Sequence, residues 1–273
     1  MGWLSFHLDR LLTHRGSLPS TAAGERVYAI GDVHGRLDLL RRLISQLSAD
    51  AYPGRRRSTR LVFLGDLIDR GPCSRQVLEL VRRMNLHSPE RLVVLCGNHE
   101  DMMLASANGH PAAQKLWLAN GGDATLHSYG IDSGEFMGLA SSERATVIKM
   151  AVGEEMLDWL EALPLAYRSG DYFFCHAGVR PGSPLNKQRR EDLLWIREEF
   201  TTSERRHGAV IVHGHSEADE VEVTASRINV DTGAYRSGKL SAVGLQGSLR
   251  WFVSTAVRYR TESDLAQAKG ACA

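Results

Sequence analysis

The fold of this chain is decided by residues 61–71, which read LVFLGDLIDRG. Residues 61–64 form an apolar run of strand length, and a glycine followed by Asp66 ends that run. Asp66 therefore lies where a strand stops and a loop begins, which is the usual place for catalytic groups in an open α/β sheet. Asp69 and Arg70 follow in the same loop. These charges need a metal, a substrate or one another as partners, because an unpaired buried charge is costly.

The same pattern of a strand followed by a polar loop recurs along the chain. Strand-like runs at 26–30, 91–96, 172–175 and 209–212 lead into GDVHG (31–35), GNHE (97–100), HAG (176–178) and HGH (213–215). Helical stripes of apolar residues lie between the first strands, at 37–47 and at about 74–84, where Ser74 is the expected N-cap. This alternation predicts an α/β fold with a parallel sheet and right-handed crossovers.

Residues 101–163 differ in character, because their apolar residues, Trp117 among them, have helical spacing. An Asn120-Gly121-Gly122 break interrupts the pattern and Pro164 closes it. We find no cluster of ligand residues in this stretch. We therefore expect a mainly helical insertion that shapes substrate access rather than performing chemistry.

The expected domain organisation is simple. Residues 1–24 would be an N-terminal extension, residues 25–260 a single domain that carries the insertion, and residues 261–273 a C-terminal tail. This division follows from the position of the first strand and from the polar, small-residue character of the last residues.

The composition is that of an ordinary globular protein. The 273 residues are 43% hydrophobic and 24% charged. A net charge of +1 gives no general attraction to nucleic acid or to a membrane surface. No apolar run approaches the ~20 residues of a membrane-spanning helix. The four cysteines show no CxxC pairing, so we expect reduced thiols in a cytoplasmic protein.

Six side chains at strand ends form one candidate set of metal ligands: Asp32, His34, Asp66, Asn98, His176 and His215. Such carboxylate, amide and imidazole donors suit manganese, iron or zinc. The set is too large for one ion but fits two divalent ions if the central Asp66 bridges them. Ions about 3.5–4 Å apart would clamp a phosphoryl oxygen and lower the pKa of a shared water.

The remaining polar residues of these loops fit the other roles in phosphate chemistry. Arg70 and Arg197 carry guanidiniums suited to bidentate phosphate binding. His99 could protonate a leaving oxygen, with Asp69 orienting its ring. No GxxxxGK phosphate loop and no GxSxG elbow occur. The other histidines considered are interpreted as structural: His110, His127, His207 and His213.

The motifs GDVHG, GDLIDRG, GNHE, HAG and GH closely resemble the series found in metal-dependent phosphoprotein phosphatases of the calcineurin-like metallophosphoesterase superfamily. The match is nearest to the bacterial and phage serine/threonine phosphatases and covers about residues 27–235. The resemblance implies a four-layer α/β/β/α sandwich with the site at the carboxyl ends of the strands.

The resemblance also implies roles for individual residues. One ion would be held by Asp32, His34 and Asp66, and a second by Asp66, Asn98, His176 and His215. His99 would be the general acid paired with Asp69, and Arg70 with Arg197 would grip the phosphate. Manganese is the expected ion, with iron or zinc as alternatives. A metal-bridging hydroxide would attack phosphoserine or phosphothreonine of a protein directly, without a covalent intermediate.

Two alternatives stay open. HAG stands where eukaryotic phosphatases have HGG. The long insertion is similar to that of bacterial symmetrical diadenosine tetraphosphate hydrolases, so a dinucleoside polyphosphate hydrolase or another nucleotide phosphoesterase is the first alternative. Symmetrical diadenosine tetraphosphate hydrolases, however, lack the full DRG and end the third motif in Asp. The intact DRG and Glu100 favour the phosphatase interpretation. A catalytically inactive binding module would lack ligands, and none is missing.

Overall fold

The computed structural model describes residues 18–50 and 58–255. Most of the expected N-terminal extension and all of the expected C-terminal tail lie outside these residues. Within the described ranges, no helix has both the length and the apolar character that crossing a membrane requires.

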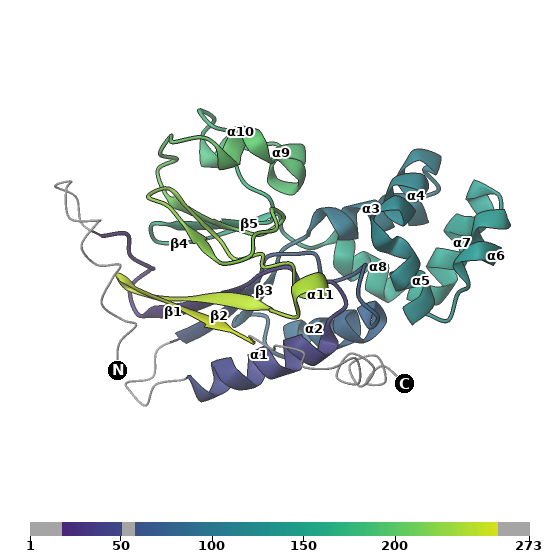
Figure 1. Cartoon of the computed structure of the whole chain (residues 1–273), viewed down its shortest axis with the longest axis horizontal. Coiled ribbons are helices and arrows are strands. Elements are labelled where there is room, and N and C mark those ends of the chain that lie inside the picture. Colours follow the sequence, from purple (N-terminus) through teal and green to yellow (C-terminus); the bar gives the residue numbers. More distant parts are fainter. Residues whose placement is uncertain (1–17, 51–57, 256–273) are drawn as a thin grey trace.

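Two five-stranded sheets form the centre of the molecule (Figure 1). The first sheet contains, in spatial order, β10 (Leu249–Ser254), β9 (Ser241–Gln246), β1 (Glu25–Ile30), β2 (Ser58–Phe63) and β3 (Leu92–Val94). The second contains β4 (Ala166–Ser169), β5 (Tyr172–Cys175), β6 (Val210–His213), β8 (Arg227–Asn229) and β7 (Glu222–Val223). Strands β1, β2 and β3 pair in parallel, which confirms the predicted arrangement, and β5, β6 and β8 do the same in the second sheet.

Helices cover the outer face of each sheet and complete the four-layer α/β/β/α sandwich (Figure 1). The helices α1 (Leu37–Ala49) and α2 (Ser74–His87) cover the first sheet, and α9 (Arg190–Trp195) and α10 (Glu198–Thr201) cover the second. A short 3₁₀ turn at Leu185–Lys187 precedes α9, and α11 (Ala234–Ser237) connects β8 to β9.

The side chains of β1 alternate between two cores, as the period of a strand requires. Val27 and Ala29 pack between the sheets, in a cluster that includes Phe174 of β5. Tyr28 and Ile30 point the other way, into the core beneath α1 and α2. Because β1 is buried on both faces here, its residues 27–30 are all apolar. The shared core holds the sheets face to face, so that loops from both reach one site.

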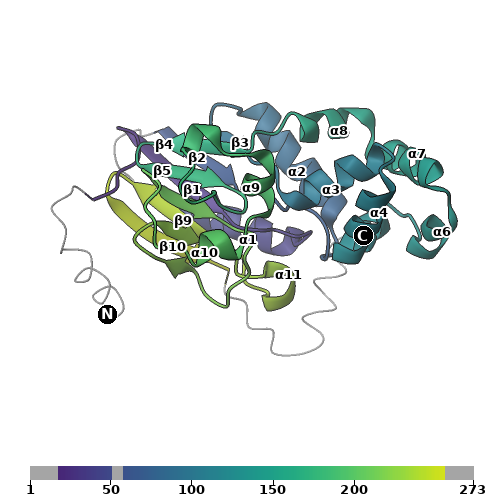
Figure 2. The ribbon, with the colours of Figure 1, turned by 90° about the horizontal axis from the view of Figure 1, so that it is seen from above.

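The insertion is mainly helical, as expected. Its helices are α3 (Asn98–Ala107), α4 (Pro111–Trp117), α5 (Asp123–Ser128), α6 (Ser133–Gly138), α7 (Ser141–Val152) and α8 (Glu154–Glu161), with a π-helical turn at Leu118–Gly122. They gather at one end of the sandwich, next to α2 and α11 (Figure 2).

Two local predictions need correction. Ser74 is the first residue of α2 rather than its N-cap, and its hydroxyl instead accepts a hydrogen bond from the backbone N–H of Asp69 at 2.9 Å. The cysteines also differ from one another. Cys96 and Cys175 are free and buried, as expected, whereas Cys73 is disulfide-bonded and is therefore not the reduced thiol that we predicted.

Candidate metal centre

The loops that follow the strands have strained backbones at the candidate site residues. Among the described residues, the non-glycine residues with positive φ are His34 (44°), Asp66 (51°), Asp69 (73°), Arg70 (65°) and His215 (63°). Each such conformation costs roughly 1–3 kcal/mol and persists only where the surrounding structure imposes it. All of them belong to the set that the sequence singled out.

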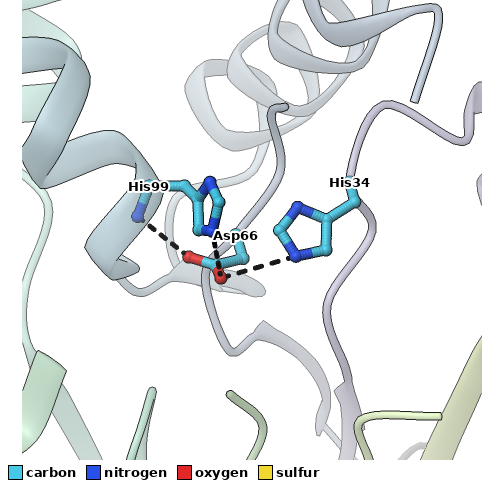
Figure 3. Close-up of side chains that lie close together, drawn as sticks. All are labelled: His34, Asp66 and His99. Carbon is cyan, nitrogen blue, oxygen red and sulfur yellow. Dashed lines mark hydrogen bonds and ion pairs between the residues drawn. The ribbon is translucent and has the colours of Figure 1, made fainter. Parts of the chain in front are cut away.

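The carboxylate of Asp66 lies at the centre of the site. Its Oδ2 is 3.6 Å from Nε2 of His34 and 3.8 Å from Nε2 of His99, and these rings approach it from two sides (Figure 3). Its Oδ1 is 3.4 Å from Nε2 of His176. Asp66 thus belongs to two groups of potential ligands, one with His34 and His99 and one with His176 and His215. A central carboxylate shared by two groups is what a bridging ligand requires.

The second group has an arrangement of acceptors that indicates a cation. Nδ1 of His176 lies 3.0 Å from the carbonyl oxygen of Leu64, so in the neutral ring Nδ1 donates and Nε2 keeps its lone pair. That lone pair faces Oδ1 of Asn98 at 2.8 Å, and Nδ1 of His215 lies 3.0 Å from the same oxygen. An imidazole lone pair and a carbonyl oxygen at this distance repel each other unless a cation binds both.

The buried carboxylates of this region also indicate a cation. Asp32 is buried and accepts a hydrogen bond from the backbone N–H of His215 at 3.1 Å, although it lies outside both groups. Burial raises the pKa of Asp32 well above its usual value, and the carboxylates of Asp231 and Asp66 add to the rise. Several buried carboxylates in one place need positive charge to compensate them.

The protonation states of the site suit metal binding. Burial lowers the pKa of His34, His176 and His215, which favours the neutral imidazoles that bind metal ions. Burial opposes the ionisation of Asp66, but His176, His99 and the other histidines outweigh it and hold the pKa of this carboxyl below its usual range. Neutral imidazoles around an ionised carboxylate are the donors that a divalent transition metal ion requires. The residues present therefore fit such ions.

His99 and Asp69 form a close pair at the edge of this centre. Nδ1 of His99 lies 2.6 Å from Oδ2 of Asp69, and both side chains are buried. Burial alone would lower the pKa of His99, but the carboxylates of Asp66 and Asp69 outweigh it and raise that pKa. Nε2, the nitrogen that faces the site, lies 3.2 Å from Nη2 of Arg70, which is a donor, so Nε2 can hold a proton when that guanidinium turns to a phosphate.

The two arginines lie beside different parts of the centre. The Nη1 atom of Arg70 is 3.0 Å from Nε2 of His34, and its Nη2 is 3.2 Å from Nε2 of His99. Arg197 is exposed at the start of α10. Burial is the largest cause that lowers the pKa of His176 and His215, and the positive charge of Arg197 is a smaller cause for both.

Glu100 has a role that sequence reasoning missed. Its Oε2 accepts hydrogen bonds from the backbone N–H groups of Asp66 (2.9 Å) and Gly97 (2.8 Å), and its Oε1 accepts one from Leu67 (2.8 Å). Burial raises the pKa of Glu100 to about 7, and the charge of Asp66 adds to the rise. One buried carboxylate thus joins the loops after β2 and β3.

Other contacts of the site were also missed. Trp117 and Thr125 of the insertion donate hydrogen bonds to Asp69, and Glu217 and Tyr235 contact the guanidinium of Arg70. The Trp117 to Thr125 stretch was visible in the sequence as a tryptophan followed by a glycine break, but neither feature predicts a hydrogen bond to a distant loop. His213 lies apart from the ligands and packs edge-on against Phe200, with ring centroids 5.0 Å apart.

Known proteins are similar to this chain in sequence. "Serine/threonine-protein phosphatase 2" of Escherichia coli is 30% identical over 224 residues, which cover 79% of this chain and 90% of that protein. "Bis(5'-nucleosyl)-tetraphosphatase, symmetrical" of Dechloromonas aromatica is 32% identical over 162 residues, which cover 59% of this chain but only 47% of that protein.

The structural comparison concerns the fold alone, because sequence identity is low. A serine/threonine phosphatase from Saccharomyces cerevisiae superimposes with a TM-score of 0.54 at 16% identity, over 90% of this chain and 86% of that one. A sequence profile described as "Calcineurin-like phosphoesterase" matches residues 25–242. This match confirms the resemblance seen in the motifs: the chain belongs to the calcineurin-like phosphoesterase family and is a metal-dependent hydrolase of phosphoesters.

Proposed function

We propose that this protein is a cytoplasmic phosphomonoesterase that removes phosphate from phosphoserine and phosphothreonine in proteins. The observation that carries the proposal is the pairing of His99 with Asp69 at 2.6 Å beside the guanidinium of Arg70 and the carboxylate of Asp66. This arrangement combines a proton donor and a phosphate-binding group at one edge of a metal centre, which is what the cleavage of an alkyl phosphate monoester requires.

The proposed ligands are those expected from the sequence: Asp32, His34 and Asp66 for one ion, and Asp66, Asn98, His176 and His215 for the other. Manganese is the expected ion, with iron or zinc as alternatives. When bound, such ions polarise phosphoryl oxygens and make water a better nucleophile near neutral pH.

The side chains of the chain itself do the rest. Arg70 and Arg197 bind the phosphate oxygens and orient the ester for in-line attack by water. His99 carries its proton on Nε2 and transfers it to the serine or threonine oxygen as the P–O bond breaks. Asp69 accepts the Nδ1–H of the same ring and holds its orientation. No side chain forms a covalent bond to phosphorus.

A second candidate is hydrolysis of dinucleoside polyphosphates. It is favoured by the names of several relatives, including the symmetrical tetraphosphatase of Dechloromonas aromatica and an asymmetrical one of Bacillus thuringiensis that is 25% identical over 233 residues. The same metal ligands would serve that reaction. The intact Asp69-Arg70-Gly71 sequence and Glu100 support the phosphatase instead.

The experiment that separates the two measures phosphate release by manganese-loaded protein. A phosphothreonine peptide, a phosphoserine peptide and diadenosine tetraphosphate are compared at matched concentrations, with a chelated sample as the blank. The proposal predicts a higher kcat/KM for the peptides. A higher kcat/KM for the dinucleotide would reject the protein substrate and move the same site to nucleotide turnover.

A further inference from the structure

The helical insertion contributes two side chains to the carboxylate of Asp69. Nε1–H of Trp117 lies 3.0 Å from both oxygens of this carboxylate. The hydroxyl of Thr125 donates to Oδ1 at 2.6 Å. Both side chains are 1% exposed, and Asp69 itself is fully buried. Residues 101–163 therefore reach the catalytic loop although they hold none of the proposed metal ligands.

Thr125 also fixes the backbone of the same residue. Its Oγ1 accepts a hydrogen bond from the backbone N–H of Asp69 at 3.0 Å. The hydroxyl of Thr125 therefore both donates a hydrogen bond to Asp69 and accepts one from it. Asp69 has a φ of 73°, a conformation that a non-glycine residue keeps only when its surroundings impose it. Thr125 and Trp117 are part of what imposes it.

The Asn120-Gly121-Gly122 break in the insertion is explained by the same contact. The chain there forms a π-helical turn with Gly121 at a φ of 98°, and π-helical turns recur at functional sites. The carbonyl oxygen of Gly121 accepts the backbone N–H of Arg70 at 3.1 Å. A Cβ at Gly121 would lie 2.8 Å from Cγ of Arg70, and one at Gly122 would lie 2.7 Å from the Trp117 ring. The glycines permit close packing against the catalytic loop.

These contacts determine how Asp69 can hold His99. Within residues 18–50 and 58–255, the side chains that donate to the Asp69 carboxylate are those of His99, Trp117 and Thr125. Thr125 occupies Oδ1, and Trp117 lies between the oxygens, so Oδ2 is left to face Nδ1 of His99. If those donors were absent, the carboxylate could rotate about χ2, and the imidazole would lose its fixed direction.

We propose that Trp117 and Thr125 are positioning residues that act through Asp69 to aim Nε2–H of His99 at the leaving oxygen. This inference rests on the proposed acid role of His99. It assigns to the insertion a part in the proton transfer, in addition to any effect on substrate access. Neither side chain touches the substrate, so loss of either should affect the chemical step rather than binding.

The test compares substrates that differ in their need for an acid. Thr125→Val removes the donor and keeps the shape, whereas Trp117→Phe removes the donor together with part of the buried ring system. Phenyl phosphate releases phenolate, a poor leaving group, so we expect kcat for this substrate to fall about tenfold or more. General acid catalysis as a whole contributes about 10²–10⁴-fold. With p-nitrophenyl phosphate, whose leaving group needs little protonation, kcat should fall less than about threefold, and KM and bound manganese should stay unchanged.

Matched controls distinguish a loss of His99 orientation from a loss of folding stability. Trp159→Phe removes an indole donor to Asn85, which lies 3.0 Å away outside the site, and should leave both rates unchanged. Thr125→Ser keeps the hydroxyl and should restore the rate with phenyl phosphate. If one variant fails to fold, the other carries the test, and a thermal unfolding midpoint is recorded for each.

His99→Asn distinguishes failure of the inference from failure of the proposed function. If His99→Asn lowers kcat selectively for phenyl phosphate but Trp117→Phe and Thr125→Val do not, the positioning role is overturned and the acid role stands. If His99→Asn itself lowers both rates equally, the acid role fails and the inference falls with it. Selective loss in all of these variants, with rescue by Thr125→Ser, supports both.

Discussion

The carboxylate of Glu217 accepts a hydrogen bond from Nη1 of Arg70 at 3.0 Å, so the proposed phosphate-binding guanidinium already has an anionic partner. Tyr235 completes the contact. Its ring lies 4.8 Å from the centre of the guanidinium, and its hydroxyl donates to the same Glu217 oxygen at 3.0 Å. A phosphate that binds Arg70 must compete with this carboxylate or share the guanidinium with it.

We therefore expect Glu217→Gln to tighten phosphate binding. Both side chains of the pair are partly exposed, and such pairs contribute about 0–1 kcal/mol, so the inhibition constant for inorganic phosphate should fall by up to about fivefold. The matched control is Glu222→Gln, which breaks a comparable pair with Arg227 at 2.9 Å on β7 and β8. Weaker phosphate binding in Glu217→Gln would mean that Glu217 orients Arg70 rather than competing for it.

Removing the charge of Glu100 should destabilise the fold. Glu100→Gln keeps the size of the side chain but replaces with a donor one of the two oxygens that accept hydrogen bonds from the backbone N–H groups of Asp66, Leu67 and Gly97. We expect a loss of about 1–3 kcal/mol in the free energy of unfolding, measured by urea denaturation. Glu199→Gln, at an exposed pair with Arg180, should change it by no more than about 0.5 kcal/mol. Equal stabilities would refute the joining role of Glu100.

A methyl group at Gly97 should disrupt the metal centre. The added Cβ would lie 2.1 Å from Oδ1 of Asp66 and 2.8 Å from Oε2 of Glu100, which no real Cβ tolerates. We expect Gly97→Ala to displace Asp66 and to lose at least about tenfold in manganese affinity. Titration calorimetry measures that affinity. Gly138→Ala, where nothing lies within 4 Å of the new Cβ, is the control. Unchanged manganese affinity in Gly97→Ala would contradict the central position of Asp66.

The pH dependence of kcat should report the pairing of His99. The pKa of this ring is raised, because Asp66 and Asp69 outweigh the effect of burial. An acid must carry its proton, so kcat should be level at low pH and fall as the pH rises through the pKa of His99. Asp69→Asn removes one carboxylate, lowers that pKa, and should move the alkaline limb to lower pH. If the alkaline limb of the pH profile does not move in Asp69→Asn, the limb reports the titration of a group other than His99.

The same raised pKa has a consequence for stability. The protonated ring of His99 is stabilised in the folded protein, so its contribution is fully present below the unfolded pKa of about 6.5. It is lost as the pH rises through the higher folded pKa.

The sandwich and the strand-end loops could be predicted because their signals are local. In β1, apolar residues run continuously and a glycine and Asp32 follow, so one short stretch carries both the strand and the loop. Parallel pairing of β1 with β2 brings His34 and Asp66 to one edge of the first sheet, and parallel pairing of β5 with β6 does the same for His176 and His215 in the second.

Contacts that depend on packing between distant segments could not be predicted. Trp117 has the sequence signature of an ordinary core residue, and only the tertiary fold places its N–H on Asp69, 48 residues away. Ser74 has the propensity of an N-cap, but its hydroxyl is engaged by Asp69 instead. Glu217 follows His215 in a loop without a recognisable pattern, so its contact with Arg70 had no signal in the sequence.

The most direct test of the account is a joint measurement of bound metal and phosphatase activity in Asp66→Asn and in the unchanged protein. Both are reconstituted with manganese, and metal content is measured by elemental analysis. If Asp66 bridges the two ligand groups, the unchanged protein should bind two ions per chain and hydrolyse p-nitrophenyl phosphate. Asp66→Asn should lose both metal and activity while remaining folded. An Asp66→Asn protein that keeps two ions and full activity would contradict the central claim.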